Sequence, residues 1–171
     1  REPQAMSCLV NLHSPGIPEP RLQLLDSALS LPGSKAVLKW VIQYDPMKFV
    51  HKNVHYYDES LKSLEEAEEY SRTLKTEDGA QALVKYFDET MNISHMRKLG
   101  RTLREQERFP VPLLLLYAKN DPMVSPKFGD DFKKLIPDAE LRHIDKGSHF
   151  AHVDGLEEFL NSALPFLARA T

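Results

Sequence analysis

The chain has 171 residues, a length that suits one domain or one domain with a sizeable insertion. Its formal net charge is −3 with scattered lysines and arginines, which disfavours the concentrated basic surface of a nucleic-acid-binding protein. No apolar run approaches the ~18 residues of a membrane span and no signal peptide is recognisable, so we expect a cytoplasmic protein with no nucleic-acid or membrane partner.

Residues 7–12 form the first predicted strand. The segment is short and apolar, and the sequence His13-Ser-Pro-Gly that follows it is a turn signal. Cys8, the single cysteine of the chain, lies within this strand. A small buried thiol is therefore favoured, and neither an internal disulfide nor a cysteine-rich metal site can form.

Residues 20–108 differ from the rest because they contain several helix-length segments and no convincing strand. The clearest are residues 60–74, 78–91 and 95–107. The first of these starts near a possible capping box, Ser63-x-x-Glu66, and its acidic run predicts a solvated helix face. Trp40 lies in the dense apolar run of residues 36–42, so we predict that it packs in a core. A helical insertion thus separates the first strand from the second.

The second predicted strand, residues 111–118, is a near-continuous apolar run, as expected of a parallel strand covered on both faces. A helical pattern follows at residues 126–136, and a third, more mixed strand at residues 139–145. Residues 153–167 place apolar side chains along one helical face. Strand, helix, strand and helix at these lengths predict a right-handed βαβ arrangement on a parallel sheet, and hence an α/β fold.

An acid and a histidine follow the second and third strands. Asp121 comes just after residues 111–118, and His149 comes just after residues 139–145. Loops beyond the carboxyl ends of neighbouring parallel strands lie side by side. A general-base histidine needs a carboxylate on its other ring nitrogen, so the two positions predict two members of a catalytic triad.

These stretches resemble α/β-hydrolases. The acid-bearing strand and loop of that family are similar to VPLLLLYAKNDPMVSP, and its last strand and histidine loop are similar to AELRHIDKGSHF, with Gly-Ser-His in place of the more usual Gly-His. The strand before the lid is similar to LVNLHSPGIP. The resemblance is nearest to the epoxide hydrolase, haloalkane dehalogenase and esterase group.

The resemblance implies the C-terminal part of a doubly wound, mostly parallel α/β-hydrolase sheet with an inserted helical cap. Residues 1–19 would supply a core strand and the loop leading to the cap. Residues 20–108 would form the cap, or lid. Residues 109–171 would complete this part of the core and carry the catalytic residues Asp121 and His149.

The nucleophile of this fold precedes both residues and sits on an elbow of the form G-x-S-x-G, or with Asp or Cys in the Ser place. No such elbow occurs here. The residues two positions after the seven glycines are Pro18, Lys35, Gln81, Thr102, Asp131, His149 and Glu157. Among them only Asp131 could be a nucleophile, and it lacks a preceding strand and a glycine two residues later. We expect the nucleophile and the oxyanion donors in an N-terminal half, in the same or a separate chain, and expect this chain alone to be inactive.

Other partners for His149 are less favoured. Asp145 and Asp154 flank it and could compete as its carboxylate, but each has the character of a surface loop acid. His143, His149 and His152 lack the spacing of a metal site on a helix, so no metal or other cofactor is expected.

The cap segment offers candidate substrate-binding residues. In epoxide-hydrolase relatives cap tyrosines donate to the epoxide oxygen, which makes Tyr56 and Tyr57 candidates, although a tyrosine is also simply a good packing residue. The same alternative applies to Tyr70 and Tyr86. Phe150 is expected to shape a pocket wall. His51 and His55 are expected to be surface or packing residues of the cap.

The resemblance therefore implies a hydrolase that acts on a small, mainly apolar substrate through a covalent intermediate. The stretch before the cap and the helical cap itself favour the epoxide hydrolase and dehalogenase group slightly over the esterases. A non-catalytic binding or scaffold protein of the same fold is the alternative. Because the first strand would present an unpaired edge, we also expect that this chain is part of a larger fold.

Overall fold

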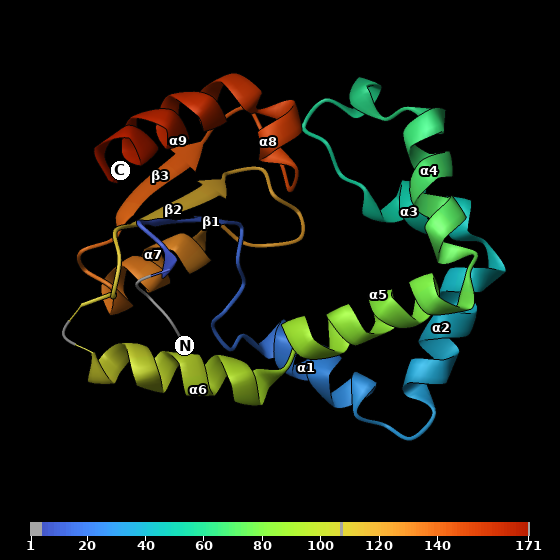
Figure 1. Ribbon diagram of the computed structural model, residues 1–171. Coiled ribbons are helices and arrows are strands. Elements are labelled where there is room, and N and C mark those ends of the chain that lie inside the picture. Colours follow the sequence, from blue (N-terminus) through green and yellow to red (C-terminus); the bar gives the residue numbers. More distant parts are fainter. Residues whose placement is uncertain (1–4, 107, 171) are drawn as a thin grey trace. The chain divides into compact units, whose positions relative to one another are not determined.

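The computed structural model describes residues 5–106 and 108–170 (Figure 1). The chain divides into two compact units. The sheet unit comprises residues 1–17, 55–59 and 98–171, and the helical unit comprises residues 18–54 and 60–97. The short segment 55–59 and most of the last helix before the second strand thus belong with the sheet, although the sequence placed them in the cap.

The sheet has three parallel strands in the order β1-β2-β3. They are β1 (Leu9–Leu12), β2 (Leu113–Ala118) and β3 (Glu140–Ile144). Every residue of β2 is buried, because the strand is central and covered on both faces. Within the described residues β1 pairs on one side only, with β2. The predicted α/β fold, with three strands in these places, is confirmed.

Helices of the sheet unit cover both faces of this sheet (Figure 1). They are α7 (Lys127–Leu135), α8 (Ala151–Asp154) and α9 (Leu156–Ala170). Leu114 and Leu116 of β2 pack against α9, while Tyr117 faces α7 close to Gly129. This alternation follows from the two-residue period of a strand.

The helix expected at residues 153–167 is interrupted. Gly155 lies between α8 and α9. Its position has no room for a side chain, because a Cβ there would lie 2.7 Å from the carbonyl oxygen of Lys146. The short helix α8 that results begins two residues after His149, and the interruption therefore shapes the surroundings of the candidate site.

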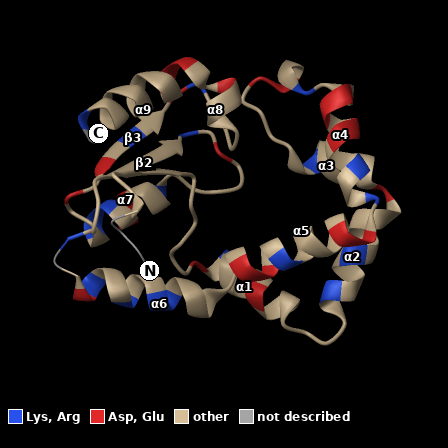
Figure 2. Cartoon of the chain, in the orientation of Figure 1, with Lys and Arg blue, Asp and Glu red and all other residues tan. Residues whose placement is uncertain are grey.

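The helical unit is built from α1 (Pro20–Leu29), α2 (Ser34–Tyr44), α3 (Pro46–Asn53), α4 (Leu64–Leu74) and α5 (Glu77–Thr90). A 3-10 turn, η2 (Glu59–Leu61), precedes α4, and α6 (Ile93–Glu105) leads back towards β2. Ser63 caps α4 by accepting a hydrogen bond from the Glu66 backbone N–H at 3.0 Å, as the sequence predicted. Of the glutamates of α4, Glu65, Glu68 and Glu69 are exposed and Glu66 is partly buried; the acidic positions of this helix are red in Figure 2. No described helix has the length and apolar character needed to cross a bilayer.

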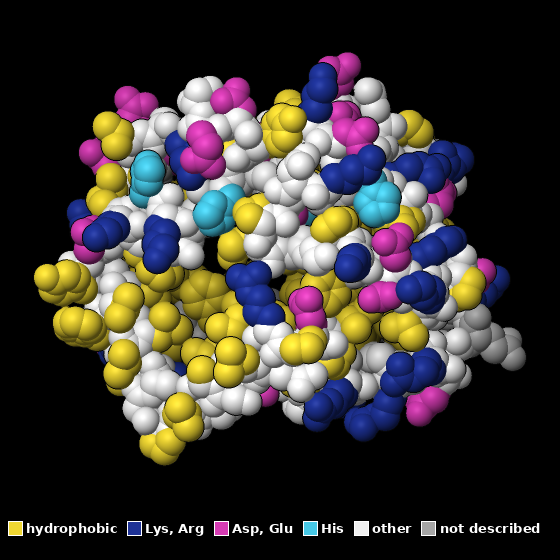
Figure 3. Space-filling view, turned by 180° about the vertical axis from the view of Figure 1, so that it is seen from behind, with side chains coloured by type: hydrophobic (Ala, Val, Ile, Leu, Met, Phe, Trp, Pro, Cys, Tyr) yellow, Lys and Arg dark blue, Asp and Glu magenta, His cyan; other side chains and the backbone are white. Residues whose placement is uncertain are grey.

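The prediction that Trp40 packs in a core is wrong. Its side chain is 62% exposed, and it contacts Tyr44 one turn further along α2. The buried face of α2 is instead defined by Ile42, which packs with Ala80 and Val84 of α5. An apolar run cannot reveal which of its members face inward when the helix buries a single stripe. Several other apolar side chains of α1 and α2 are exposed as well, and Figure 3 shows them gathered on the surface of these helices.

Two glycines provide a test of the packing behind the sheet. A Cβ on Gly129 in α7 would lie 2.7 Å from the Tyr117 ring and 2.9 Å from Leu141. Gly129→Ala is therefore expected to destabilise the fold by roughly 1–3 kcal/mol through overpacking. Gly100→Ala in α6 meets nothing closer than 3.6 Å and should stabilise by about 0.5–1 kcal/mol. Thermal unfolding of both variants checks this, and an increase in Tm for Gly129→Ala would refute the close contact.

Candidate catalytic site

Asp121 is anchored in the loop directly after β2. Its side chain is fully buried, and its Oδ1 accepts hydrogen bonds from the backbone N–H groups of Met123 at 2.7 Å and Val124 at 3.0 Å. An aspartate that bonds the backbone two and three residues ahead is a common way to fix a turn. The turn leaves the second carboxylate oxygen, Oδ2, facing the neighbouring strand-end loops.

His149 lies in the loop between β3 and α8, and its Nδ1 is 2.9 Å from Asp121 Oδ2. The two residues that the sequence paired are thus in hydrogen-bond contact. With Nδ1–H donating to the carboxylate, the neutral ring carries its lone pair on Nε2, which is the tautomer of a general base. The His149 side chain is 30% exposed, so part of the ring is accessible.

The electrostatics of Asp121 favour its ionised form. Burial alone raises the pKa of this carboxyl. The hydrogen bonds from His13 and His149, the Val124 N–H and the nearby His149 charge outweigh the burial, and together they hold the pKa of Asp121 well below its usual range. A carboxylate that keeps its negative charge can orient an imidazole and stabilise the imidazolium that forms on it.

The structure adds a third side chain that the sequence did not indicate. His13, assigned only to a turn signal, is buried, and its Nδ1 lies 3.0 Å from the same Asp121 Oδ2. Its ring centroid is 5.8 Å from that of His149. His13 is the first residue after β1, so the strand-end argument that paired Asp121 with His149 could have included it.

Asp154 is not a surface loop acid, as the sequence suggested. It is the last residue of α8, and its carboxylate accepts hydrogen bonds from the Ser148 N–H at 3.2 Å and the Ser148 hydroxyl at 2.9 Å. It also accepts one from the backbone N–H of Tyr57. Asp154 therefore holds the loop before His149 rather than His149 itself. Asp145 is exposed and pairs with Lys119 at 2.6 Å.

Segment 55–59 lies against the histidine loop. The Ser148 hydroxyl has the carbonyl oxygen of His55 as a second acceptor besides Asp154, and its one proton is shared between them. The Tyr56 ring contacts the Phe150 ring at a centroid distance of 5.5 Å. Tyr56 is 5% exposed, whereas Tyr57 is exposed and contributes its backbone. Tyr56 and Phe150 are therefore brought together next to His149.

The remaining sequence candidates lie elsewhere. Tyr70 and Tyr86 are exposed residues of the helical unit. Asp131 lies within α7 and pairs with Lys134 at 2.8 Å. His143 faces Asp130 at 3.9 Å, and His152 contacts the Phe150 and Phe159 rings. The described residues contain no group of three or more His, Cys, Asp or Glu arranged to hold a metal ion.

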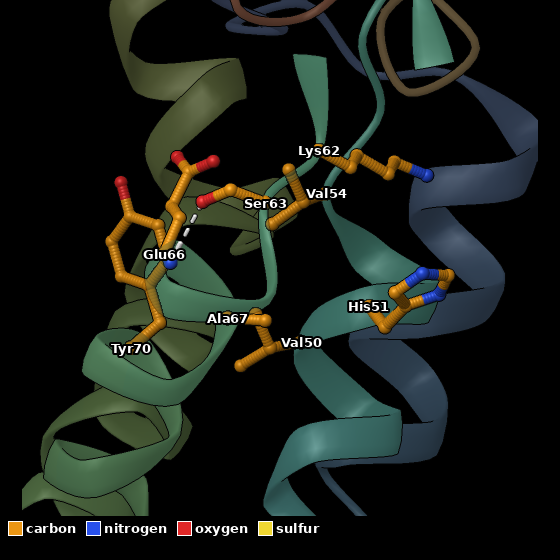
Figure 4. A pocket seen from close by; sticks show the side chains of 8 residues that line it. All are labelled: Val50, His51, Val54, Lys62, Ser63, Glu66, Ala67 and Tyr70. Atoms are coloured by element: carbon orange, nitrogen blue, oxygen red, sulfur yellow. Dashed lines mark hydrogen bonds between the residues drawn. The ribbon is translucent and has the colours of Figure 1, made fainter. Parts of the chain in front are cut away.

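A small pocket lies within the helical unit between α3 and α4 (Figure 4). Its lining residues are Val50, His51, Val54, Lys62, Ser63, Glu66, Ala67 and Tyr70. The Ser63 hydroxyl at its edge is used by the cap of α4. None of its lining residues is Asp121, His149 or a residue bonded to them, so the pocket is separate from the candidate catalytic groups.

A parallel sheet with an acid and a histidine on successive strand-end loops defines an α/β fold of the hydrolase type. Residues 39–156 match the family described as "alpha/beta hydrolase fold". The chain belongs to this family, which confirms the resemblance seen in its motifs.

Curated relatives match part of the chain. It is 34% identical over 76 residues to the sn-1-specific diacylglycerol lipase ABHD11 of Xenopus tropicalis, a match covering 44% of this chain and 24% of the relative. It is 26% identical over 74 residues to the mouse protein of the same name, covering 43% and 24%. The match thus spans about a quarter of the length of these relatives.

Solved structures with the same fold cover nearly the whole chain. A thermophilic esterase from Thermogutta terrifontis has a TM-score of 0.67 at 10% identity, covering 99% of this chain and 58% of the esterase. The 2-hydroxy-6-oxo-6-phenylhexa-2,4-dienoate hydrolase from Rhodococcus sp. strain RHA1 has a TM-score of 0.60 at 20% identity, covering 94% and 54%. At these identities the likeness concerns the fold. This chain spans between half and two thirds of each neighbour.

Proposed function

We propose that this chain supplies the catalytic acid and the catalytic histidine of an α/β-hydrolase that acts through a covalent intermediate. The observation that carries the proposal is the 2.9 Å contact between His149 Nδ1 and the buried carboxylate of Asp121. A buried carboxylate that orients an accessible imidazole is the arrangement needed to move a proton to and from a nucleophile or a water molecule.

The nucleophile would come from an elbow outside these 171 residues, in the same or a separate polypeptide. If it is Ser or Cys, His149 would first take its proton and later activate the water that releases the product. If it is Asp, His149 would activate only the water. In both cases Asp121 would hold the ring and stabilise its protonated form.

Ester hydrolysis is the reaction that the similar proteins support. The curated relatives are called lipases, and one structural neighbour is called an esterase, so a serine nucleophile acting on a small, mainly apolar ester is the first form to test. Epoxide hydrolysis and dehalogenation, which the motif before the cap favoured, are the next reactions to test. A cytoplasmic location, expected from the sequence, stays a prediction.

The helical insertion at residues 20–108 is proposed to act as the cap over the substrate. Tyr56 and Phe150 are the pocket-wall candidates that the structure supports best, because their rings touch beside His149. Tyr57 is a weaker candidate because the hydrogen bond described for it uses its backbone N–H.

The first test is native followed by denaturing mass spectrometry of the protein purified from the cells that make it. We expect a native species heavier than 19.6 kDa by the polypeptide that carries the elbow, which can then be sequenced for Ser, Asp or Cys. A fluorophosphonate probe should label that residue if it is Ser, and the same preparation should hydrolyse 4-nitrophenyl butyrate. A lone 19.6 kDa species that is folded and without esterase, epoxide hydrolase or dehalogenase activity would favour a non-catalytic binding protein instead.

A further inference from the structure

We propose that His13 is a positioning residue of the acid–histidine pair: it shares the Asp121 carboxylate with His149 and so sets how strongly His149 holds its proton. This inference rests on the proposed function for its importance in catalysis, but the coupling itself concerns three side chains of this chain. It can therefore be measured independently of any activity.

The placement of His13 is fixed by its backbone. The His13 N–H donates to the carbonyl oxygen of Leu116 at 3.0 Å, which extends the pairing of β1 with β2 by one residue. The chain then turns, and among the described residues His13 is the one non-glycine with a positive φ, at 55°. Such a conformation costs energy for a residue with a side chain, and surrounding structure must hold it. The Tyr117 hydroxyl does so by donating to the carbonyl oxygen of Ser14 at 2.7 Å.

The hydrogen bonds of Asp121 identify what His13 contributes. Oδ1 accepts two backbone N–H groups, and Oδ2 lies 3.0 Å from His13 Nδ1 and 2.9 Å from His149 Nδ1. The Ala118 N–H also points at His13 Nδ1 from 3.5 Å, a bond that Nδ1 could accept only without its own proton. We assign the proton to Nδ1, because the contact with the negative carboxylate is shorter, at 3.0 Å. Each carboxylate oxygen thus receives two donors, which uses its full acceptor capacity.

Within the described residues the His13 ring contacts Asp121 and lacks the accessible edge that His149 has. Nε2 is buried and has no hydrogen-bond partner among the described residues, whereas His149 is partly accessible. The described contacts of the His13 ring are with Asp121, Ala118, Tyr117 and His149. Its influence on a reaction would therefore pass through Asp121, which is why we call it a positioning residue.

His13 and His149 both contact the same oxygen of Asp121 and both stabilise its negative charge. The attraction that the carboxylate exerts on His149 is therefore weaker than it would be without His13. Removing the His13 donor leaves Asp121 with His149 as its one imidazole partner, so the attraction between the carboxylate and a protonated His149 increases. The pH at which His149 loses its proton should then rise. An asparagine at position 13 can return an N–H donor near the place of Nδ1, and asparagine also tolerates positive φ.

Few other titratable groups lie near His13, Asp121 and His149, so the effect of His13 on the protonation of His149 can be measured separately. Tyr117 comes from β2, and its pKa is raised by burial. Asp154 and His152 come from α8, where Asp154 bonds Ser148 and His152 contacts Phe150. His55 contributes its carbonyl oxygen from segment 55–59. The Tyr117 ring contacts the His13 ring, so the comparison of His13→Gly with His13→Asn, which both remove that ring contact, isolates the donor.

The experiment is an NMR pH titration of the His149 imidazole in the form of the protein identified by native mass spectrometry. His13→Leu removes the donor, His13→Gly removes it while relieving the backbone, and His13→Asn restores it. We expect the His149 midpoint to rise by about 0.5–1 pH unit in His13→Leu or His13→Gly and to stay near wild type in His13→Asn. If His13→Leu does not fold, His13→Gly carries the test.

The outcomes separate this inference from the proposed function. Equal midpoints in all variants, or equal shifts in His13→Gly and His13→Asn, would overturn the role of His13 even if the protein is a hydrolase that depends on His149. A midpoint that rises and is rescued by asparagine would support the coupling even in a preparation without hydrolase activity. In an active preparation the acidic limb of kcat/KM should move with the NMR midpoint.

Discussion

Asp121→Asn is expected to lower kcat for ester hydrolysis by roughly four orders of magnitude, as loss of the acid does in other acid–histidine pairs. Asparagine removes the negative charge that would stabilise a protonated His149. Its amide can also present an N–H to His149 Nδ1, which would then have to accept and would place its proton on Nε2. The ring would no longer have a lone pair where a general base needs it. The measurement is kcat on 4-nitrophenyl butyrate with the elbow-bearing polypeptide present.

The matched control is Asp145→Asn, the same change at an exposed acid 24 positions further along the chain. Asp145 pairs with Lys119 on the surface, and such a pair contributes about 0–1 kcal/mol, so kcat should be unchanged. If Asp121→Asn retained more than about a tenth of the wild-type kcat, Asp121 would not be the catalytic acid.

Much of the sheet could be predicted because the sequence of its central strand fits a fully buried parallel strand better than any other element. Residues 113–118 are apolar without alternation, and all of them are buried. Asp121 and His149 follow successive strands, and parallel pairing brings the ends of those strands together, so their contact followed from chain order alone. The same logic applied to β1 points to His13, but a single histidine before Ser-Pro-Gly also fits an ordinary turn. Its contact depends on a positive φ that composition does not reveal.

The two errors have a common physical cause. Trp40 was expected to be buried from the apolar density around it, and Asp154 was expected in a surface loop from its place near His149. Each outcome depends on which side of a helix the residue occupies: α2 buries Ile42 instead, and α8, which Gly155 separates from α9, turns Asp154 towards Ser148. Short helices and single-stripe helices are set by tertiary contacts more than by local sequence.

Asp154→Ala is expected to loosen the histidine loop and segment 55–59 together. The substitution removes the acceptor for the Ser148 N–H and the Tyr57 N–H, and Ser148 is buried. A buried donor left without a partner costs about 1–3 kcal/mol, so Tm should fall by roughly 2–12 °C for a chain of this size. Hydrogen exchange should become faster at the backbone amides of Tyr57 and Ser148, because these donate to the lost carboxylate.

The corresponding control is Glu157→Ala, which removes an exposed acid three residues later in α9 and should change stability by about 0.5 kcal/mol or less. In an active preparation Asp154→Ala should lower kcat through misplacement of His149, whereas Glu157→Ala should not. Unchanged exchange at both Tyr57 and Ser148 in Asp154→Ala would show that Asp154 does not hold the two segments. The position of His149 would then depend on Asp121 and the Ser148–His55 hydrogen bond, because those contacts link the same loop to β2 and to segment 55–59.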